Sequence, residues 1–570
     1  MISTAPLTST AATPTATACR AADRIVETLQ ALGVRWVFGV PGAKIDPVYD
    51  ALAAVGSPRL ITCRTEQGAA SMAAAIGRLT GIPGVVLVTS GPGTSNLATG
   101  LITATTEGDP VVAICGAVRR ADRLKRTHQT MDAAGLLSTV TKSTAEVATA
   151  DNVPEAITAA FRAAVQAPQG ATAVVLPYDV GLEQTTVTMT DPWRESTLGV
   201  ATDDTLARAA ALLSAAEFPV ILAGARAGTD RTVAALHRLL RTTDLPVVET
   251  FQAAGIVSRE LEDHYLGRVG FARNQPGDVV LHSADVVLAV GYDFVEYEPA
   301  VWNRGRKRII IHLDEIPADV DDAYRPVVEA VGRIDSSLDR LADLVAGLTL
   351  GTTASRIVDT ERVRLSASAD TPDHHDDEHG LDPVALTLAL RQAVPDETTV
   401  LCDVGSHYLY LARYFRTYRP RSLMFSNGQQ NLGVALPWAI AASLARPETP
   451  VLSVSGDGGF LYSAGELATA VSLGASLTHV IFNDGTYDMV AFQQLQKYGR
   501  TAGVELGSYD VVGFAKAFGA HGHRVTSLAD LPATIARAMA EPGPSLIDAP
   551  VDYRDNYAVL GADLLADLLV

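Results

Sequence analysis

The chain has 570 residues, of which 48% are hydrophobic and 19% charged, and its formal net charge is −19. A chain of this length exceeds what one hydrophobic core can organise, so about three or four domains are expected. The acidic balance argues against sequence-independent binding to nucleic acid, which needs a basic face. It does not exclude an anionic substrate, because the local charge at a site matters more than the total.

Residues 1–18 are rich in Thr, Ala, Ser and Pro and lack the basic start and apolar core of a secretory signal. We expect them to form a disordered tail. No apolar run in the sequence is long enough to span a membrane. The four cysteines form no CxxC pair, and buried free thiols in a reducing compartment are their simplest account. The sequence therefore predicts a cytoplasmic protein without a membrane partner.

From residue 19 to residue 180, apolar runs alternate with stretches of helical character. Residues 85–89 and 111–115 predict buried strands, and residues 67–79 predict a helix. Such alternation indicates a doubly wound parallel sheet.

A second α/β unit is expected at residues 190–348, with strands at 219–224, 286–290 and 308–313. Glycines after these strands are only a weak sign of a dinucleotide site.

Residues 351–380 are polar and charged and predict a linker. The His- and Asp-rich residues 373–379 are interpreted as solvated rather than metal-binding, because no predicted strand or helix orients them. The third α/β unit runs from residue 381 to residue 570, and Asp382 and Pro383 are the predicted N-cap and first-turn residues of its first helix. The fold class predicted is α/β, with three doubly wound parallel-sheet domains.

Two acidic residues of the third unit follow successive apolar runs. Asp457 lies in a GDGGF sequence after residues 451–455, and Asp484 lies in FNDGTY after residues 477–482. Residues 460–473 between them predict a helix, and such a crossover places both strand ends at one edge of the sheet. Two carboxylates there can share a hard divalent cation, and bare glycines let backbone N–H groups approach phosphate. A diphosphate held through Mg²⁺ is the predicted ligand, and a simple strand-end turn is the alternative.

The spacing of this pair resembles that of the thiamine diphosphate-dependent enzymes, and the resemblance extends over nearly the whole chain. Residues 38–46, 90–97 and 107–112 are similar to acetolactate synthases. A further set resembles the flavin-free catabolic branch of that family, namely residues 128–132, 297–303, 426–430 and 551–556.

The resemblance implies roles residue by residue. Asp457, Asp484 and the backbone carbonyl of Thr486 are implied as metal ligands. Glu66, which opens a predicted helix, is implied to hydrogen-bond the pyrimidine ring of the cofactor and so to activate it; on physics alone, an acid there favours the helix dipole. Because Glu66 lies in the first unit and the Asp pair in the third, the family arrangement implies active sites shared within a homodimer or homotetramer.

Gln129 is implied to face the substrate and Leu432 to bend the cofactor, with an ordinary loop position and plain core packing as the respective alternatives. His407 is a candidate phosphate donor, although a lone histidine is more often structural. The other implied cofactor-binding residues are Gly405, Ser406, Gln430, Gly458, Gly459 and Tyr487.

Residues 291–296 carry two acids where flavin-containing relatives carry basic residues, so no FAD is expected. Gln493 stands where biosynthetic relatives carry a Trp that favours 2-ketobutyrate, and losing that apolar contact removes about 1–3 kcal/mol of discrimination. The implied reaction decarboxylates pyruvate on thiamine diphosphate and ligates the hydroxyethyl carbanion to a second pyruvate, giving 2-acetolactate and CO₂.

Two alternatives stay open at this point. Thr486, Asp488 and His407 depart from the catabolic pattern, which motivates a sister carboligase with another acceptor. A non-catalytic paralogue is the other alternative, and the presence of Glu66, Asp457 and Asp484 together argues against it.

Overall fold

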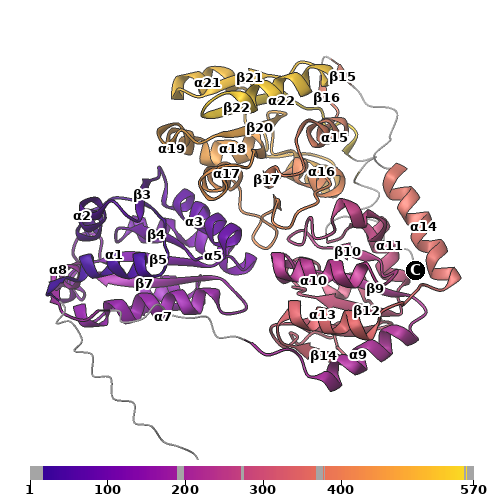
Figure 1. The fold of residues 1–570 in the computed structure, drawn as a ribbon. Coiled ribbons are helices and arrows are strands. Elements are labelled where there is room, and N and C mark those ends of the chain that lie inside the picture. Colours follow the sequence, from indigo (N-terminus) through magenta and orange to yellow (C-terminus); the bar gives the residue numbers. More distant parts are fainter. Residues whose placement is uncertain are drawn as a thin grey trace, which may run out of the picture.

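The computed structural model describes residues 17–188, 198–270, 275–367, 376, 377, 379–556 and 560. These residues form three six-stranded sheets, and every strand pairing within the three sheets is parallel. Figure 1 shows the three sheets as three lobes, each with helices packed against its faces. The predicted α/β class with three parallel-sheet domains is confirmed.

The first domain has the strand order β3-β2-β4-β5-β7-β6. Its central strands β4, β5 and β7 are buried along almost their whole length, which is why they read as continuous apolar runs. The strands are β2 (Trp36–Val40), β3 (Arg59–Thr62), β4 (Gly84–Val88), β5 (Val111–Ala117), β6 (Ser143–Glu146) and β7 (Ala171–Pro177). The helices are α1 (Ala21–Ala31), α2 (Asp46–Val55), α3 (Glu66–Thr80), α4 (Pro92–Asn96), α5 (Ala98–Glu107), α6 (Ala133–Ser138), α7 (Val153–Val165) and α8 (Tyr178–Leu182).

The third domain has the order β18-β17-β19-β20-β22-β21, which is the order of the first domain when strands are counted from each domain's own first strand. The strands are β17 (Thr399–Cys402), β18 (Leu423–Met424), β19 (Val451–Gly456), β20 (Leu477–Asn483), β21 (His521–Arg524) and β22 (Pro544–Pro550). The helices are α15 (Pro383–Ala393), α16 (Ser406–Tyr414), α17 (Ala435–Ala445), α18 (Asp457–Ser463), α19 (Leu467–Leu473), α20 (Asp488–Tyr498), α21 (Val511–Phe518) and α22 (Leu531–Ala540).

The middle domain has a different order, β11-β10-β9-β12-β13-β14. The chain therefore moves outward in one direction from β9 and in the other from β12, which creates a topological switch point between these two strands. The strands are β9 (Pro219–Ala223), β10 (Val247–Glu249), β11 (Tyr265–Arg268), β12 (Val286–Val290), β13 (Ile309–Asp314) and β14 (Val328–Val331). The helices are α9 (Asp203–Ala215), α10 (Asp230–Leu240), α11 (Pro276–Ser283), α12 (Pro299–Trp302) and α13 (Ile334–Leu344).

The predicted linker is a helix over part of its length. Helix α14 (Thr352–Ala367) forms because Ala354 and Val358 recur at helical spacing and are buried against the middle domain. Residues 352–367 of the predicted linker are therefore helical and packed on the middle domain. Residues 373–375 and 378 of the His- and Asp-rich segment, and residues 1–16 of the predicted tail, lie outside the described residues.

The helix predicted over residues 460–473 is divided in two. Helix α18 already begins at Asp457, and a 3₁₀ turn (Ala464–Glu466) separates it from α19. The turn directs the side chain of Glu466 out of the third domain and toward the first.

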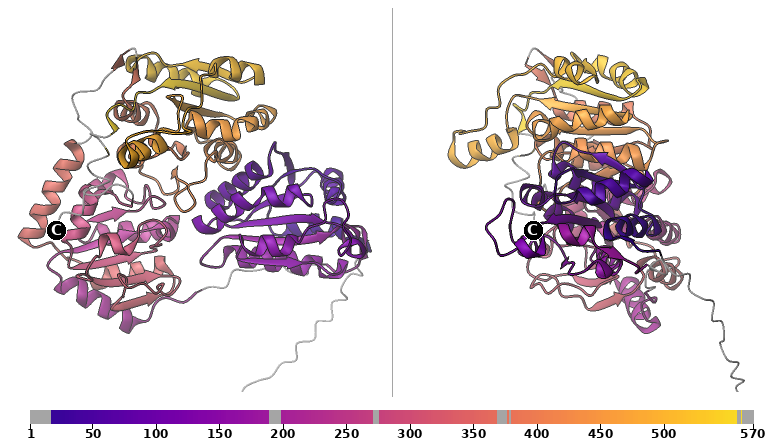
Figure 2. Two further views of the ribbon diagram at one scale, coloured as in Figure 1. Left: turned by 180° about the vertical axis from the view of Figure 1, so that it is seen from behind. Right: turned by 90° about the vertical axis from the view of Figure 1, so that its left-hand side faces the viewer.

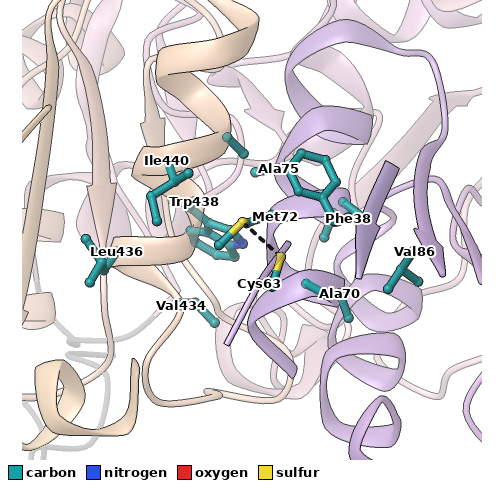
Figure 3. Close-up of a cluster of buried hydrophobic side chains, with 14 of the residues drawn as sticks. Phe38, Cys63, Ala70, Met72, Ala75, Val86, Val434, Leu436, Trp438 and Ile440 are labelled. Atoms are coloured by element: carbon teal, nitrogen blue, oxygen red, sulfur yellow. Dashed lines mark hydrogen bonds between the residues drawn. The ribbon is translucent and has the colours of Figure 1, made fainter. Parts of the chain in front are cut away.

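The first and third domains share one hydrophobic core, in which α3 packs against α17. Residues 435–442 of α17 are buried on all sides, as expected for a helix with no polar face. Figure 3 shows Trp438 of α17 beside Met72 of α3, whose sulfur lies 3.8 Å from Sγ of Cys63. The start of α3 is thereby held close to the third domain.

All three domains meet at one buried polar junction. The Gln252 side chain of the middle domain donates to Glu107 of the first domain and, at 2.8 Å, to the Phe425 carbonyl of the third. Arg78 lies beside it in a bidentate pair with Asp109. In both views of Figure 2 the third domain lies above the other two. None of the described helices combines the length and apolarity needed to cross a membrane.

Candidate active site

The predicted metal-binding acids lie together at the carboxyl edge of the third sheet. Strands β19 and β20 are parallel neighbours with Gly456 opposite Phe482, so the residues that follow them emerge side by side. Asp457 is the first residue of α18 and is 1% exposed. Asp484 follows β20 and accepts a hydrogen bond from the Thr486 hydroxyl.

Asp457 is a buried carboxylate without a hydrogen-bond partner. Among the described residues, neither of its side-chain oxygens has a donor within hydrogen-bonding geometry. Burial raises the pKa of Asp457 to about 6, against the opposing effect of the nearby Gly458 and Gly485 backbone N–H groups. Buried polar atoms are normally satisfied, so this pair of oxygens indicates a missing cationic ligand.

The pKa of Asp484 rises to about 7, mainly through burial and further through the charges of Asp457 and Asp488. Two carboxylates that penalise one another's charge suit a divalent cation, which removes that penalty. The described residues contain no group of three or more His, Cys, Asp or Glu side chains arranged around a metal position. A cation there needs further oxygen ligands, which a backbone carbonyl and a diphosphate supply.

The backbone beside Asp457 is closely approached by other site residues. A Cβ atom on Gly458 would lie 2.5 Å from a ring carbon of Tyr487, and one on Gly459 would lie 2.9 Å from a carboxylate oxygen of Asp403. Neither position accepts a side chain without displacing its neighbours. The two glycines therefore allow Tyr487 and Asp403 to pack directly against the backbone at the start of α18.

The predicted residues after β17 line the same edge. Gly405 precedes α16, and Ser406 at its start donates a hydrogen bond to the carboxylate of Asp488. His407 is fully buried, and its Nε2 lies 3.0 Å from the Asp403 carbonyl oxygen.

Burial lowers the pKa of His407 to about 3, so its ring is neutral. Because a carbonyl only accepts, Nε2 carries the proton, and Nδ1 has none to give. The structure thus argues against His407 as a phosphate donor and favours the structural alternative.

Gln430 and Leu432 lie on the loop before α17 and line a cavity of about 430 Å³ between this loop and α5 of the first domain. Asp403, which the sequence reasoning did not single out, fixes that loop. Its carboxylate accepts from the backbone N–H groups of Gly433 and Ala435 at 2.9 and 3.0 Å. Asp403 could have been found from the sequence, because it directly follows the buried strand β17 just as Asp457 directly follows β19.

Glu66 is the first residue of α3 and is half-buried. Its Oε2 accepts from Nδ2 of Asn96 at 3.0 Å, a partner that the sequence reasoning did not identify although it lies within the family-like residues 90–97. Gln129 contacts the other end of the segment formed by residues 90–96. There its Oε1 accepts from Oγ of Ser90 at 3.3 Å. Glu66 and Gln129 therefore flank one loop at the carboxyl edge of the first sheet.

The predicted residues fall into two groups, with Glu66 and Gln129 on the first domain and Asp457 and Asp484 on the third. Gln493 is exposed on α20, and the cavity of about 830 Å³ beside Asp484 is lined instead by the neighbouring Phe492 and Gln496 and by the residues around Tyr553.

Three family models match the chain. They describe the N-terminal thiamine pyrophosphate binding domain over residues 19–136, the central domain of these enzymes over 206–341, and the C-terminal thiamine pyrophosphate binding domain over 403–549. An acetolactate synthase of Bacillus subtilis is 50% identical over 537 residues, which are 94% of each chain. The chain belongs to the thiamine pyrophosphate enzymes.

Other relatives narrow the family further. A catabolic acetolactate synthase of Raoultella terrigena is 43% identical over 548 residues, covering 96% of this chain and 98% of the relative. The large subunit of acetolactate synthase isozyme 2 of Escherichia coli is 30% identical over 545 residues, covering 94% and 96%. The predicted resemblance to acetolactate synthases is confirmed.

Proposed function

We propose that this thiamine pyrophosphate enzyme converts two pyruvate molecules into 2-acetolactate and CO₂. The observation that carries the proposal is the unpartnered, buried carboxylate of Asp457 beside Asp484, within the residues matched by the C-terminal thiamine pyrophosphate binding domain. Acetolactate synthases at 43–50% identity over nearly the whole chain support the same reaction.

Asp457, Asp484 and the carbonyl of Thr486 would hold Mg²⁺, and the N-terminus of α18 at Gly458 and Gly459 would bind the diphosphate. The donor set fits, because it consists of hard oxygen atoms whose raised pKa values a cation would lower. When bound, thiamine diphosphate supplies a nucleophilic carbon and an electron sink for the loss of CO₂ from a 2-keto acid.

The protein's own residues bind, orient and move protons. Glu66, whose carboxylate accepts from Asn96, would exchange a proton with the pyrimidine ring of the bound cofactor. Asp403 fixes the loop that carries Gln430 and Leu432. Leu432 would pack under the cofactor, and the carbonyl of Gln430 would accept from the pyrimidine amine. Gln129 orients the substrate from the first domain, and Gln493 contributes to the choice of acceptor from α20.

A complete site is formed by two copies of the chain, as a homodimer or homotetramer. The arrangement is supported by the placement of Glu66 on the first domain and of the Asp pair on the third. Apolar side chains are also exposed beside the third-domain site, among them Leu461 (43%) and Tyr462 (58%), and a second copy would cover them. Localisation in the cytoplasm is supported by the free thiols of Cys63, Cys115 and Cys402, which are all buried.

We also propose that the enzyme works without FAD. The switch point of the middle sheet is occupied by Arg226, whose guanidinium pairs with Asp293 at 2.8 Å and with Asp314 at 2.8 Å. The remaining cavity there is about 130 Å³, well below the roughly 300–1,000 Å³ of typical cofactor sites. Glu296, the second acid noted in the sequence, is buried and accepts from the Ala225 and Gln252 backbone N–H groups.

The reaction is tested by incubating the purified chain with pyruvate, Mg²⁺ and thiamine diphosphate and assaying acetolactate. Rapid formation of acetolactate from pyruvate alone is the expected result. Slow turnover that a second carbonyl compound accelerates would favour a sister carboligase with another acceptor. No turnover with any 2-keto acid would favour a non-catalytic paralogue.

Shared sites are tested by mixing two inactive variants, Glu66→Gln and Asp457→Ala. After subunit exchange, a mixed dimer contains one site with both native residues, so about a quarter of the wild-type activity should return. If each site belonged to a single chain, the mixture would stay inactive.

A further inference from the structure

Glu466 is a buried carboxylate that belongs to the third domain but binds the backbone of the first. It ends the 3₁₀ turn between α18 and α19 and is 1% exposed. Its Oε1 accepts from the backbone N–H groups of Arg64 and Thr65, at 3.0 and 2.9 Å, and from the Thr65 hydroxyl at 3.2 Å. Four hundred residues of chain separate these partners, so the contact exists only in the folded protein.

These donors are the two peptide groups that precede Glu66. Thr65 is the N-cap of α3, and its Oγ1 accepts from the Gly68 N–H at 2.9 Å. Backbone N–H groups at a helix start have no partner within the helix, so a buried carboxylate there fixes how the chain enters the helix. Glu66 is the first residue that this entry positions.

The fit of Glu466 against α3 depends on a glycine. A Cβ atom on Gly68 would lie 2.4 Å from Oε1 of Glu466 and 2.9 Å from its carboxyl carbon. The carboxylate itself is held from the far side by Thr469, whose Oγ1 donates to Oε2 at 2.7 Å. Neither partner has room to shift, so the contact is tightly defined.

The other side of Glu66 is also bound to the third domain. Gln67 donates through Nε2 to Oδ1 of Asn431 at 3.2 Å, and Asn431 lies between Gln430 and Leu432. The residues on both sides of Glu66 are therefore hydrogen-bonded to third-domain segments that themselves carry predicted cofactor contacts. Glu466 follows the same helix that Asp457 begins.

We propose that Glu466 is a positioning residue for Glu66: by binding the Arg64 and Thr65 peptide groups, it sets the place of the Glu66 carboxylate relative to the cofactor. The inference rests on the proposed function, in which Glu66 exchanges a proton with the pyrimidine ring. It adds a requirement that the third domain hold the acid of the first.

The first test is Glu466→Gln, which preserves size but removes the negative charge and replaces one of the two accepting oxygens with an NH₂ group that only donates. We expect exchange of the thiazolium carbon proton of bound thiamine diphosphate with deuterated water to slow by about 10- to 100-fold, as for a catalytic group moved by a fraction of an ångström. The kcat should fall in parallel. The affinity for thiamine diphosphate with Mg²⁺ and the KM for pyruvate should stay within about twofold, because their binding groups are untouched.

A second readout needs no cofactor. Amide hydrogen exchange in the free protein should accelerate at Arg64 and Thr65 in Glu466→Gln, because the single neutral amide oxygen accepts from the two N–H groups more weakly than the carboxylate does. Gly68→Ala disturbs the same contact while leaving the Glu466 carboxylate in place, because its Cβ atom would displace that carboxylate. It should reproduce both the slower thiazolium exchange and the faster amide exchange. Glu541→Gln, a change in a partly exposed glutamate beside His523, is the matched control and should alter neither readout.

The outcomes separate this inference from the proposed function. Glu66→Gln is measured in parallel and should abolish the thiazolium exchange. If it does so while Glu466→Gln and Gly68→Ala exchange at the wild-type rate, the positioning role is wrong and the proposed function stands. If Glu66→Gln itself exchanges normally, both are overturned. A loss of cofactor affinity equal to the loss of kcat in Glu466→Gln would also contradict the positioning role.

Discussion

The first and third domains have the same strand order but different residues at the carboxyl edges of equivalent strands. In the third domain, β19 and β20 lead into Asp457 and Asp484. In the first domain, the equivalent β4 and β5 lead into Thr89 and Val118, and its acid, Glu66, follows β3 instead. The two domains thus have the same sheet topology, and the residues that follow the strands determine which ligand groups each carboxyl edge can bind.

The helices α3 and α17 extend this comparison, because they follow equivalent strands and pack against one another. At the start of each helix, backbone N–H groups donate to the buried carboxylate of a residue outside that helix. Asp403 binds the N-terminus of α17 from within its own domain, whereas Glu466 binds that of α3 from the other domain. In the positioning role proposed for Glu466, the first-domain acid Glu66 thus depends on the third domain for its position.

The largest effect is expected from breaking the packing between these two helices. Trp438→Ala removes a side chain that is 1% exposed in the shared core, and should lower the free energy of unfolding by about 3–5 kcal/mol. Chemical denaturation measures it. Tyr498→Ala, at a side chain that is 64% exposed, is the control and should change stability by less than about 0.5 kcal/mol. Equal effects of the two variants would show that the helices do not hold the domains together.

Asp457→Ala tests whether the third-domain edge is the metal-binding one. It should weaken Mg²⁺-dependent binding of thiamine diphosphate more than about 100-fold and leave the circular dichroism spectrum unchanged, because it removes a metal ligand and no internal hydrogen bond. Titration calorimetry gives the affinity. Asp359→Ala on the exposed face of α14 should bind as the wild type does. Wild-type affinity in Asp457→Ala would remove this residue from the site.

The buried Glu296 of the middle domain should make the stability of the protein depend on pH. Burial raises the pKa of Glu296 from 4.5 to about 7, so its contribution to stability is complete below its unfolded pKa and is lost as the pH rises through about 7. Relative to Glu296→Gln, the wild type should therefore lose roughly 3 kcal/mol of stability between pH 4 and pH 8. Thermal unfolding of both proteins across this range measures the difference. A constant difference would show that the carboxyl group keeps an ordinary pKa.

The smallest effect concerns the helix that opens the third domain. Asp382 caps α15 by accepting from the Ala385 N–H at 2.8 Å, as the sequence predicted. Asp382→Ala should cost about 1 kcal/mol of unfolding free energy, and Asp382→Asn should cost much less, because Asn is an equally good N-cap. Denaturation midpoints compare the three proteins. Equal losses in both variants would mean that the charge of Asp382 matters more than the cap.

Much of the site was predictable because its signals are local. Asp457, Asp484 and Glu66 each lie next to an apolar run that predicts a buried strand, and parallel strands present their carboxyl ends at one edge. Helix α14 was missed because its polar composition outweighed the helical spacing of Ala354 and Val358. The break at Glu466 was missed although Gly465, a poor helix former, lies within it, because the apolar residues on either side suggested one continuous helix.

The sequence by itself determined the three α/β domains, the acids at the strand ends and the family to which the chain belongs. Apolar periodicity and short motifs carry that information over a few residues at a time. Only the tertiary structure decided that Glu466 holds the start of α3, that Asp403 fixes the Leu432 loop and that Arg226 fills the middle switch point. Those contacts join residues up to 402 positions apart, and no local pattern records which distant backbone group a buried charge will meet.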